Sequence, residues 1–154
     1  MDPQLEAAWL MLSRLKAAQG DETASAGYLV RGLDKLPRSI GLLLERAGSE
    51  AGRGHDGKAI DWYRRVIAID ENQKDALIGV AASALRMGNS GLALDSSAKI
   101  LVLEPGNTDA LVVSAIASYS TGDIVHAREF ARRAREFNPL IQLPDELNQM
   151  LLGG

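Results

Sequence analysis

Two residue types recur along the chain with one common period. The glycines are Gly20, Gly54, Gly88 and Gly122, each 34 residues after the one before. The prolines Pro3, Pro37, Pro105 and Pro139 keep the same spacing, and Glu71 stands where the missing proline would fall. A fixed period of this length indicates a repeated supersecondary unit that buries its apolar face against its neighbours.

Each repeat is predicted to be a helix, a tight turn and a second, antiparallel helix. In the third repeat one face of the first helix carries Leu77, Val80, Ala81 and Ala84, at i, i+3, i+4 and i+7. Gly88 then ends that helix, because glycine adopts the left-handed C-terminal conformation without a Cβ penalty. Asn89 or Ser90 can cap the second helix, and Pro105 ends it. The alternation typical of strands is absent, so the fold class is all-α.

A small residue follows every turn at the same register position. These residues are Ser25, Ala59, Ala93 and Ala127. A small side chain at this position allows the two helices of a hairpin to approach closely. We therefore expect this position to be buried in every repeat.

The composition narrows the class of protein further. The chain has 154 residues, of which 46% are hydrophobic, and a formal net charge of −3. It can therefore bury a core, and its charge argues against a general nucleic-acid binder. The absence of cysteine excludes disulfides, thiolate metal sites and cysteine nucleophiles.

The repeat resembles the tetratricopeptide repeat, whose 34-residue unit carries a pattern of Trp, Leu, Gly, Tyr, Ala, Phe and Pro. The matching positions are Trp9, Leu12, Gly20, Leu29 and Pro37, then Leu43, Ala47, Gly54, Ala59, Tyr63 and Val66, then Leu77, Ala81, Gly88, Ala93, Ile100 and Pro105, and finally Leu111, Ala115, Gly122, Ala127, Ala134 and Pro139. The resemblance implies a single domain over 1–154, a right-handed superhelical solenoid of four antiparallel helix hairpins. The repeats run over about 6–39, 40–73, 74–107 and 108–141.

Four positions depart from the family pattern. Arg46 and Ser114 stand where the family prefers Leu, and Lys16 and Glu50 stand where it prefers Tyr. We therefore expect the first helix of the second repeat to pack less tightly than the others.

The two ends of the array differ. Asp2 and Pro3 look like the end of a preceding repeat, which indicates a fragment of a longer array, although Asp as N-cap and Pro at the first helical position also make an ordinary helix start. Residues 142–154 lack the repeat register and carry an apolar stripe, Leu143, Leu147, Met150 and Leu151, ending at Gly153 and Gly154. This segment is expected to be a capping helix over the fourth repeat or the first helix of a degenerate fifth.

The resemblance also implies a concave groove lined by the first helix of each repeat. The candidate partner-binding residues on that face are Leu10, Met11, Arg14, Leu44, Ile78, Ala82, Leu85, Val112, Val113, Ile116 and Tyr119. Most are apolar, and Gly41, Gly48 and Gly79 on the same face leave room for a backbone. An apolar helical or extended peptide is the expected occupant. A second copy of the chain, a missing segment of the same protein, or ordinary core packing are the alternatives.

One known use of such grooves is disfavoured. Chaperone-associated members of the family hold a peptide's terminal carboxylate with Lys, Asn and Arg. Here only Arg14 and Arg86 are basic on the groove face.

The remaining polar groups give weaker signals. Arg128, Arg132 and Arg135 form a basic stripe that could hold phosphate or nucleic acid. The pairs Glu129–Arg133 and Arg132–Glu136, each at i, i+4, instead favour a solvated helix face. The two histidines, His55 and His126, have no ligand partner at metal-binding spacing, and Asp56 and Asp123 fit helix N-caps better than catalytic acids. No catalytic residue, cofactor site or metal site is therefore predicted.

These observations predict a protein–protein interaction module without chemistry of its own. Its partner is expected to be a protein or peptide, including a second copy of the chain, with no nucleic acid, membrane insertion or small-molecule substrate. The alternatives are a self-associating scaffold and a regulatory segment of a larger secretion, envelope-assembly or enzyme protein. The resemblance implies a bacterial assembly role, in the cytoplasm or the periplasm. Trp62, which is expected to pack on a neighbouring helix, is a minor candidate for a partner site on the convex face.

Overall fold

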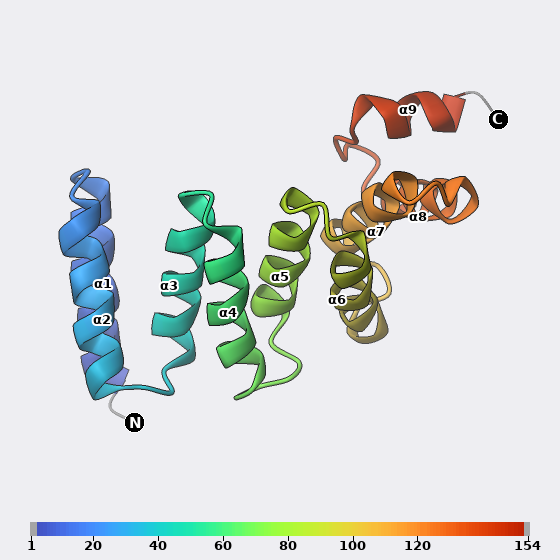
Figure 1. Cartoon of the computed structure of the whole chain (residues 1–154). Helices are drawn as coiled ribbons and strands as arrows, with labels where there is room; N and C mark the ends of the chain where they lie inside the picture. The colour runs from blue at the N-terminus through green and yellow to red at the C-terminus, as the bar shows by residue number, and fades with distance from the viewer. Residues whose placement is uncertain (1–2, 153–154) are drawn as a thin grey trace. The chain divides into compact units, whose positions relative to one another are not determined.

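The computed structural model describes residues 3–152, and the described part of the chain contains helices and turns but no strands (Figure 1). The helices are α1 (Pro3–Ala18), α2 (Glu22–Lys35), α3 (Ile40–Gly52), α4 (Asp56–Ile67), α5 (Lys74–Arg86), α6 (Ser90–Leu103), α7 (Thr108–Ser120), α8 (Ile124–Phe137) and α9 (Asp145–Leu152). The prediction of an all-α chain is confirmed. The predictions made for Asp2, Gly153 and Gly154 lie outside the described residues.

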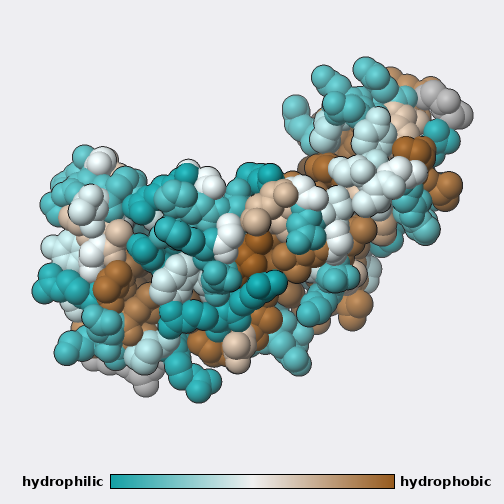
Figure 2. All heavy atoms as spheres, in the orientation of Figure 1, coloured by the Kyte–Doolittle hydropathy of each residue, from teal (hydrophilic) through white to brown (hydrophobic). Residues whose placement is uncertain are grey.

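The chain divides into two compact units. The N-terminal unit is Met1–Ala76 and the C-terminal unit is Leu77–Gly154. In the N-terminal unit α1 pairs with α2 and α3 with α4, while α3 also packs on α1 and α2. On the face that Figure 2 shows, hydrophobic and hydrophilic residues are mixed over the N-terminal unit. In the C-terminal unit α7 packs on both α6 and α8, and α9 packs on α7 and α8.

The four repeated glycines have the backbone conformation that their spacing predicts. Their φ values are +77° at Gly20, +76° at Gly54, +72° at Gly88 and +80° at Gly122. Beyond three of these turns the side chain of Asp21, Asn89 or Asp123 accepts a hydrogen bond from a backbone N–H of the next helix. In the second repeat His55 holds the N-cap position without a side-chain cap, and Asp56 is the first helical residue. The N-cap prediction is therefore confirmed for Asp123 and wrong for Asp56.

The small residue after each turn is buried in all four repeats. Ala59, Ala93 and Ala127 are 0% exposed. In the first repeat the hydroxyl groups of Ser25 and Ser13 form a buried hydrogen bond of 2.9 Å. The equivalent positions in the second repeat are Ala47 and Ala59. The first hairpin therefore has a hydrogen-bonded pair of hydroxyl groups where the second has two apolar side chains.

This packing gives a testable stability effect. Ala127→Leu forces extra methyl groups into the contact between α7 and α8, and we expect it to lower the free energy of unfolding by about 1–3 kcal/mol. Urea unfolding followed by circular dichroism measures the loss. Ala98→Leu, at an exposed position in α6, is the control and should change stability by less than about 0.5 kcal/mol. Equal stability of the two variants would contradict the close helix contact.

The final helix closes over the last hairpin. Leu143 and Leu147 are buried in a cluster with Ala115 of α7 and Ala131 of α8. The half-buried apolar residues around the cluster are Val112, Ile116, Phe130, Ile141, Met150 and Leu151. Arg135 Nη2 in α8 also donates a 2.6 Å hydrogen bond to Asn148 Oδ1 in α9. The apolar stripe read from the sequence thus faces α7 and α8.

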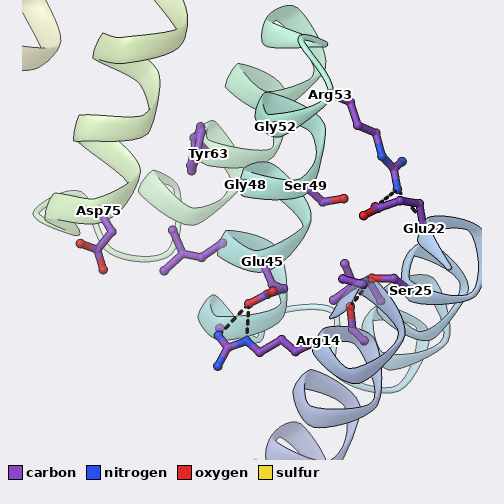
Figure 3. A pocket seen from close by; sticks show the side chains of 15 residues that line it. Arg14, Glu22, Ser25, Glu45, Gly48, Ser49, Gly52, Arg53, Tyr63 and Asp75 are labelled. Atoms are coloured by element: carbon purple, nitrogen blue, oxygen red, sulfur yellow. Dashed lines mark hydrogen bonds and ion pairs between the residues drawn. The ribbon is translucent and has the colours of Figure 1, made fainter. Parts of the chain in front are cut away.

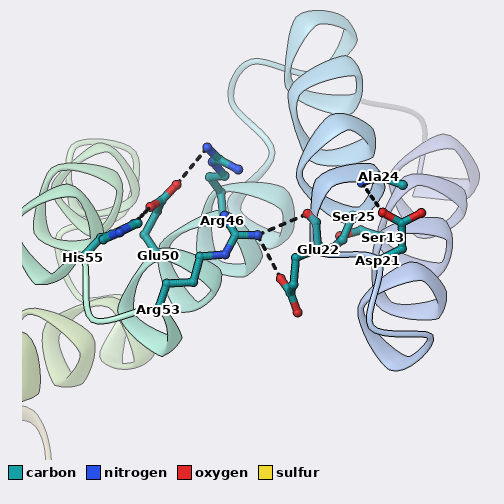
Figure 4. A network of polar contacts seen from close by, with 9 residues as sticks. All are labelled: Ser13, Asp21, Glu22, Ala24, Ser25, Arg46, Glu50, Arg53 and His55. Carbon is teal, nitrogen blue, oxygen red and sulfur yellow. Dashed lines mark hydrogen bonds and ion pairs between the residues drawn. The ribbon is translucent and has the colours of Figure 1, made fainter.

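The expectation of loose packing in the second repeat is wrong. Helix α3 packs against α4 as closely as α1 packs against α2 and as α7 packs against α8. Arg46 Nη2 pairs with Glu50 Oε1 at 2.8 Å, and the other carboxylate oxygen of Glu50 lies 2.8 Å from Nδ1 of His55 (Figure 4). The Arg46 guanidinium also lies 5.8 Å from the ring centre of Trp62. The two unusual residues therefore compensate each other, with help from α4.

Candidate functional site

The N-terminal unit contains a pocket of about 660 Å³ along one face of α3. Helix α1 contributes Arg14 and Ala17, and α2 contributes residues from its first two turns. The α3 residues that line it are Gly41, Leu44, Glu45, Gly48, Ser49 and Gly52. Figure 3 shows Glu45 directed toward Arg14 and Ser49 on the side of α3 that faces Glu22 and Ser25. Arg14 and Leu44, together with Gly41 and Gly48, are lining residues that the repeat register places on the concave face.

Glycines leave the α3 backbone uncovered by side chains on the wall of this pocket. A Cβ added at Gly48 or Gly52 would meet nothing within 4 Å, so open space lies above both residues. At Gly41 the side chains of Glu6 and Leu10 already fill the space that a Cβ would take. An approaching chain can therefore come close to the α3 backbone over its last two turns.

Two ion pairs between helices border the pocket. Arg14 in α1 reaches Glu45 Oε2 through Nε at 2.8 Å and through Nη2 at 2.6 Å. Arg53, just after α3, donates to Glu22 Oε2 at 2.8 Å and to the Glu22 backbone carbonyl at 3.2 Å (Figures 3 and 4). The hydrogen bond to Glu45 raises the pKa of Arg14, so this side chain stays charged. Both arginines already have a carboxylate partner within the chain.

Three of the predicted groove positions, Leu10, Met11 and Arg14, also line a shallower hollow on α1. Ala7, Leu10, Met11 and Arg14, together with Leu15, line a space of about 540 Å³. Met11 is 71% exposed, so its thioether side chain is accessible on this face. Arg14 belongs to both hollows, and the α1 candidates therefore form one accessible surface.

The candidates of the C-terminal unit have a different environment. Val112 and Ile116 pack against the cluster that α9 forms with α7 and α8. Helix α9 therefore covers part of the surface that the register assigns to the groove. Tyr119 remains 39% exposed. The other candidates in this unit are half-buried: Ile78, Ala82, Leu85 and Val113.

Several residues of the pocket were not predicted from the sequence. Glu22, Ser49, Gly52 and Arg53 line it, but all four lie outside the face that the register assigns to the groove. Arg53 and Glu22 are 31 residues apart, as are Arg14 and Glu45. Opposite charges separated by nearly one repeat length were the sequence signal that could have predicted these ion pairs between helices.

The other polar groups have structural partners. Arg132 lies 3.7 Å from Glu136, whereas Arg133 donates to the backbone carbonyl of Pro105 and not to Glu129 as predicted. His126 Nδ1 lies 2.7 Å from Asp123 Oδ2, and this hydrogen bond lowers the pKa of Asp123. The ring centre of Trp62 lies 5.8 Å from the Arg46 guanidinium and 4.5 Å from the Arg65 guanidinium. These contacts give Arg132 of the basic stripe, and Trp62, a partner within the chain.

Neither metal-site chemistry nor a membrane span is found in residues 3–152. Within this range no three His, Cys, Asp or Glu side chains are grouped so that they could bind a metal ion. None of the helices in the same range combines the length and the apolar character needed to cross a bilayer.

The arrangement of consecutive helix hairpins defines a tetratricopeptide-repeat fold, and solved structures share it. A MamA protein from Desulfovibrio magneticus RS-1 superposes with a TM-score of 0.86 at 17% identity, over 97% of this chain and 85% of that one. A tetratricopeptide repeat protein from Parabacteroides merdae gives 0.82 at 18% identity, over 99% and 58%. The first such domain of RPAP3, bound to an HSP90 peptide, gives 0.69 at 18% identity, over 74% and 91%.

Sequence comparison adds no closer relative. No protein-family model matches the chain, and no curated protein matches it in sequence. The comparisons therefore show which fold the chain has.

Proposed function

We propose that the chain is an interaction module that binds a peptide segment of a partner protein across the pocket of the N-terminal unit. The observation that carries this proposal is the open space over Gly48 and Gly52 within a pocket of about 660 Å³. Pockets of several hundred Å³ are typical of ligand sites. The RPAP3 domain, which shares the fold, is bound to a peptide, and this supports a peptide as the class of ligand.

The lining favours an extended segment with a mixed apolar and polar sequence. Leu44 offers an apolar contact, while the Ser49 hydroxyl makes no hydrogen bond within residues 3–152 and is available to a backbone amide or carbonyl. Arg14 and Arg53 are held by Glu45 and Glu22, so the terminal carboxylate of a peptide would have to compete with both ion pairs. We therefore expect an internal segment and not a chain end.

A substitution that fills the space over α3 should weaken peptide binding without lowering the stability of the fold. Gly48→Leu places a side chain in the pocket, and its Cβ meets no other atom within 4 Å. Replacing a helical glycine also stabilises a helix by up to about 1 kcal/mol. We expect the variant to be at least as stable as the parent, yet to bind at least about tenfold more weakly, a change of about 1.4 kcal/mol. The probe is a peptide selected from a random phage-displayed library on the parent protein and measured by fluorescence anisotropy.

The matched control is Gly27→Leu. Gly27 is an exposed glycine inside α2 with nothing within 4 Å, and it does not line the pocket. This variant should gain similar stability and keep full affinity. Unchanged binding by Gly48→Leu would contradict the proposal. Light scattering tests whether a second copy is the occupant. In that case the mass of the parent rises with concentration, whereas Gly48→Leu has the mass of a monomer.

A further inference from the structure

The C-terminal unit contains an apolar groove between α6 and α8, separate from the pocket of the N-terminal unit. It encloses about 450 Å³. Helix α6 contributes Leu94, Ala98, Leu101 and Val102, and α8 contributes Phe130 and Arg133. Val102 is 82% exposed and Ala98 is also exposed, while Leu94 and Leu101 are half-buried, so the outer part of the α6 wall is open to solvent.

Comparison with the other repeats shows that the exposed part of this wall, Ala98 and Val102, is not required by the fold, whereas the positions of Leu94 and Leu101 hold the buried residues Ile60 and Leu33 in earlier repeats. The residues one period after Leu94, Ala98, Leu101 and Val102 are Arg128, Arg132, Arg135 and Glu136. At positions where α8 carries four charged residues, α6 therefore carries four apolar ones. Contiguous apolar surface of this kind marks interaction sites on soluble domains.

The polar groups around the groove favour a helical occupant. The Ser114 hydroxyl is 2.8 Å from that of Ser97, and Arg133 Nη2 donates to the Pro105 carbonyl at 3.0 Å. The groove walls therefore offer few hydrogen bonds to a ligand backbone. An extended peptide would leave its N–H and C=O groups unpaired against apolar side chains, which is costly. A helix brings its own backbone hydrogen bonds and does not meet this cost.

Charge defines one further property of the occupant. Asp95 lines the groove, and its carboxylate makes no hydrogen bond or ion pair within the described part of the chain. Arg133, the other charged residue of the lining, is already held by a carbonyl. The unpaired charge is therefore negative, and it complements a basic residue on the ligand.

We propose that the α6–α8 groove binds an amphipathic helix of a partner protein, with aliphatic side chains against Leu94, Ala98 and Val102 and a Lys or Arg beside Asp95. This surface belongs to the C-terminal unit, whereas the peptide pocket belongs to the N-terminal unit. The chain then offers two separate docking surfaces for two different kinds of segment, which is the property of a scaffold.

A pair of synthetic helical peptides tests the proposal on the whole chain. One probe is an amphipathic helix of Leu and Lys, and the other has Glu in place of every Lys. We expect the Leu/Lys probe to bind and to shift the amide resonances of α6 and α8. Ala98→Gln combined with Val102→Gln should weaken binding about tenfold or more without changing the charge. Asp95→Lys should reverse the preference, so that the Leu/Glu probe binds better.

The control places the same changes one repeat later. Arg132→Gln combined with Glu136→Gln also leaves the net charge unchanged but lies outside the groove, and it should keep parental affinity. The proposal is overturned if neither probe binds, if the Leu/Glu probe is preferred by the parent, or if the α6 double variant binds as well as the control. It is also overturned if the same residues mediate self-association in light scattering. If the Ala98→Gln and Val102→Gln double variant does not fold, the proposal is judged by whether Asp95→Lys reverses the preference between the two probes.

Discussion

Leu147→Asp is expected to detach α9 from the C-terminal unit. Leu147 is 1% exposed in the cluster with Ala115 and Ala131, and an aspartate there would have to be buried without a counter-charge. Loss of a buried leucine alone costs about 2–5 kcal/mol. Because α9 has only eight residues, its release is less costly than unfolding of the hairpin beneath it. Hydrogen exchange should show lost protection in α9 and increased exchange in α7.

The control for this variant is in the same helix. Leu152→Asp introduces the same charge at a position that is 81% exposed, and it should leave exchange in α7 unchanged. Detachment would also expose Val112 and Ile116, which the repeat register assigns to the groove. If Leu147→Asp keeps α9 protected, the cluster does not hold the helix in place.

Glu50→Gln is expected to destabilise the N-terminal unit by about 3 kcal/mol, the cost of breaking a buried ion pair from one side. Glu50 is 4% exposed and pairs with both Arg46 and His55. The variant leaves Arg46 charged, and its Nε and Nη1 atoms are buried without other partners. Chemical denaturation measures the loss. Glu45→Gln removes a surface ion pair with Arg14 and should cost less than about 1 kcal/mol.

The same residue gives the stability a defined pH dependence. The hydrogen bond from His55, with a smaller contribution from Arg46, lowers the pKa of Glu50 although its burial opposes this. A lowered carboxyl pKa stabilises the folded state at pH values above the ordinary pKa of Glu, and this contribution is lost as the pH falls through the lowered value. The parent should therefore lose stability in acid more steeply than Glu50→Gln. If the free energies of unfolding of the parent and of Glu50→Gln fall equally with decreasing pH, Glu50 is not the source of this pH dependence.

The repeat itself could be predicted in detail because its signals are local. A single turn requires a glycine with a positive φ, and a single contact between two helices requires a small buried residue. For this reason Gly20 and Ala59, with their equivalents, are found as predicted. Even the α9 stripe follows from the spacing of Leu143 and Leu147 alone.

The parts that could not be predicted depend on residues far apart in the chain. Arg46 and Glu50 read as defects in α3, since the sequence does not show that Trp62 stacks on one and His55 bonds to the other. The ion pair of Arg53 with Glu22 likewise joins residues from different repeats. The coverage of Val112 by α9 depends on how a segment without repeat register folds back, and periodicity carries no information about this.

The pattern of helix contacts has a consequence for how the chain folds. Within each unit the helices that touch are neighbours or next neighbours along the chain, as α1 with α3 and α7 with α9. Chains dominated by such contacts have low contact order and close only short loops, so they fold quickly, on microsecond to millisecond timescales. We expect hairpins to form early and independently, and a segment emerging from the ribosome to gain structure one repeat at a time.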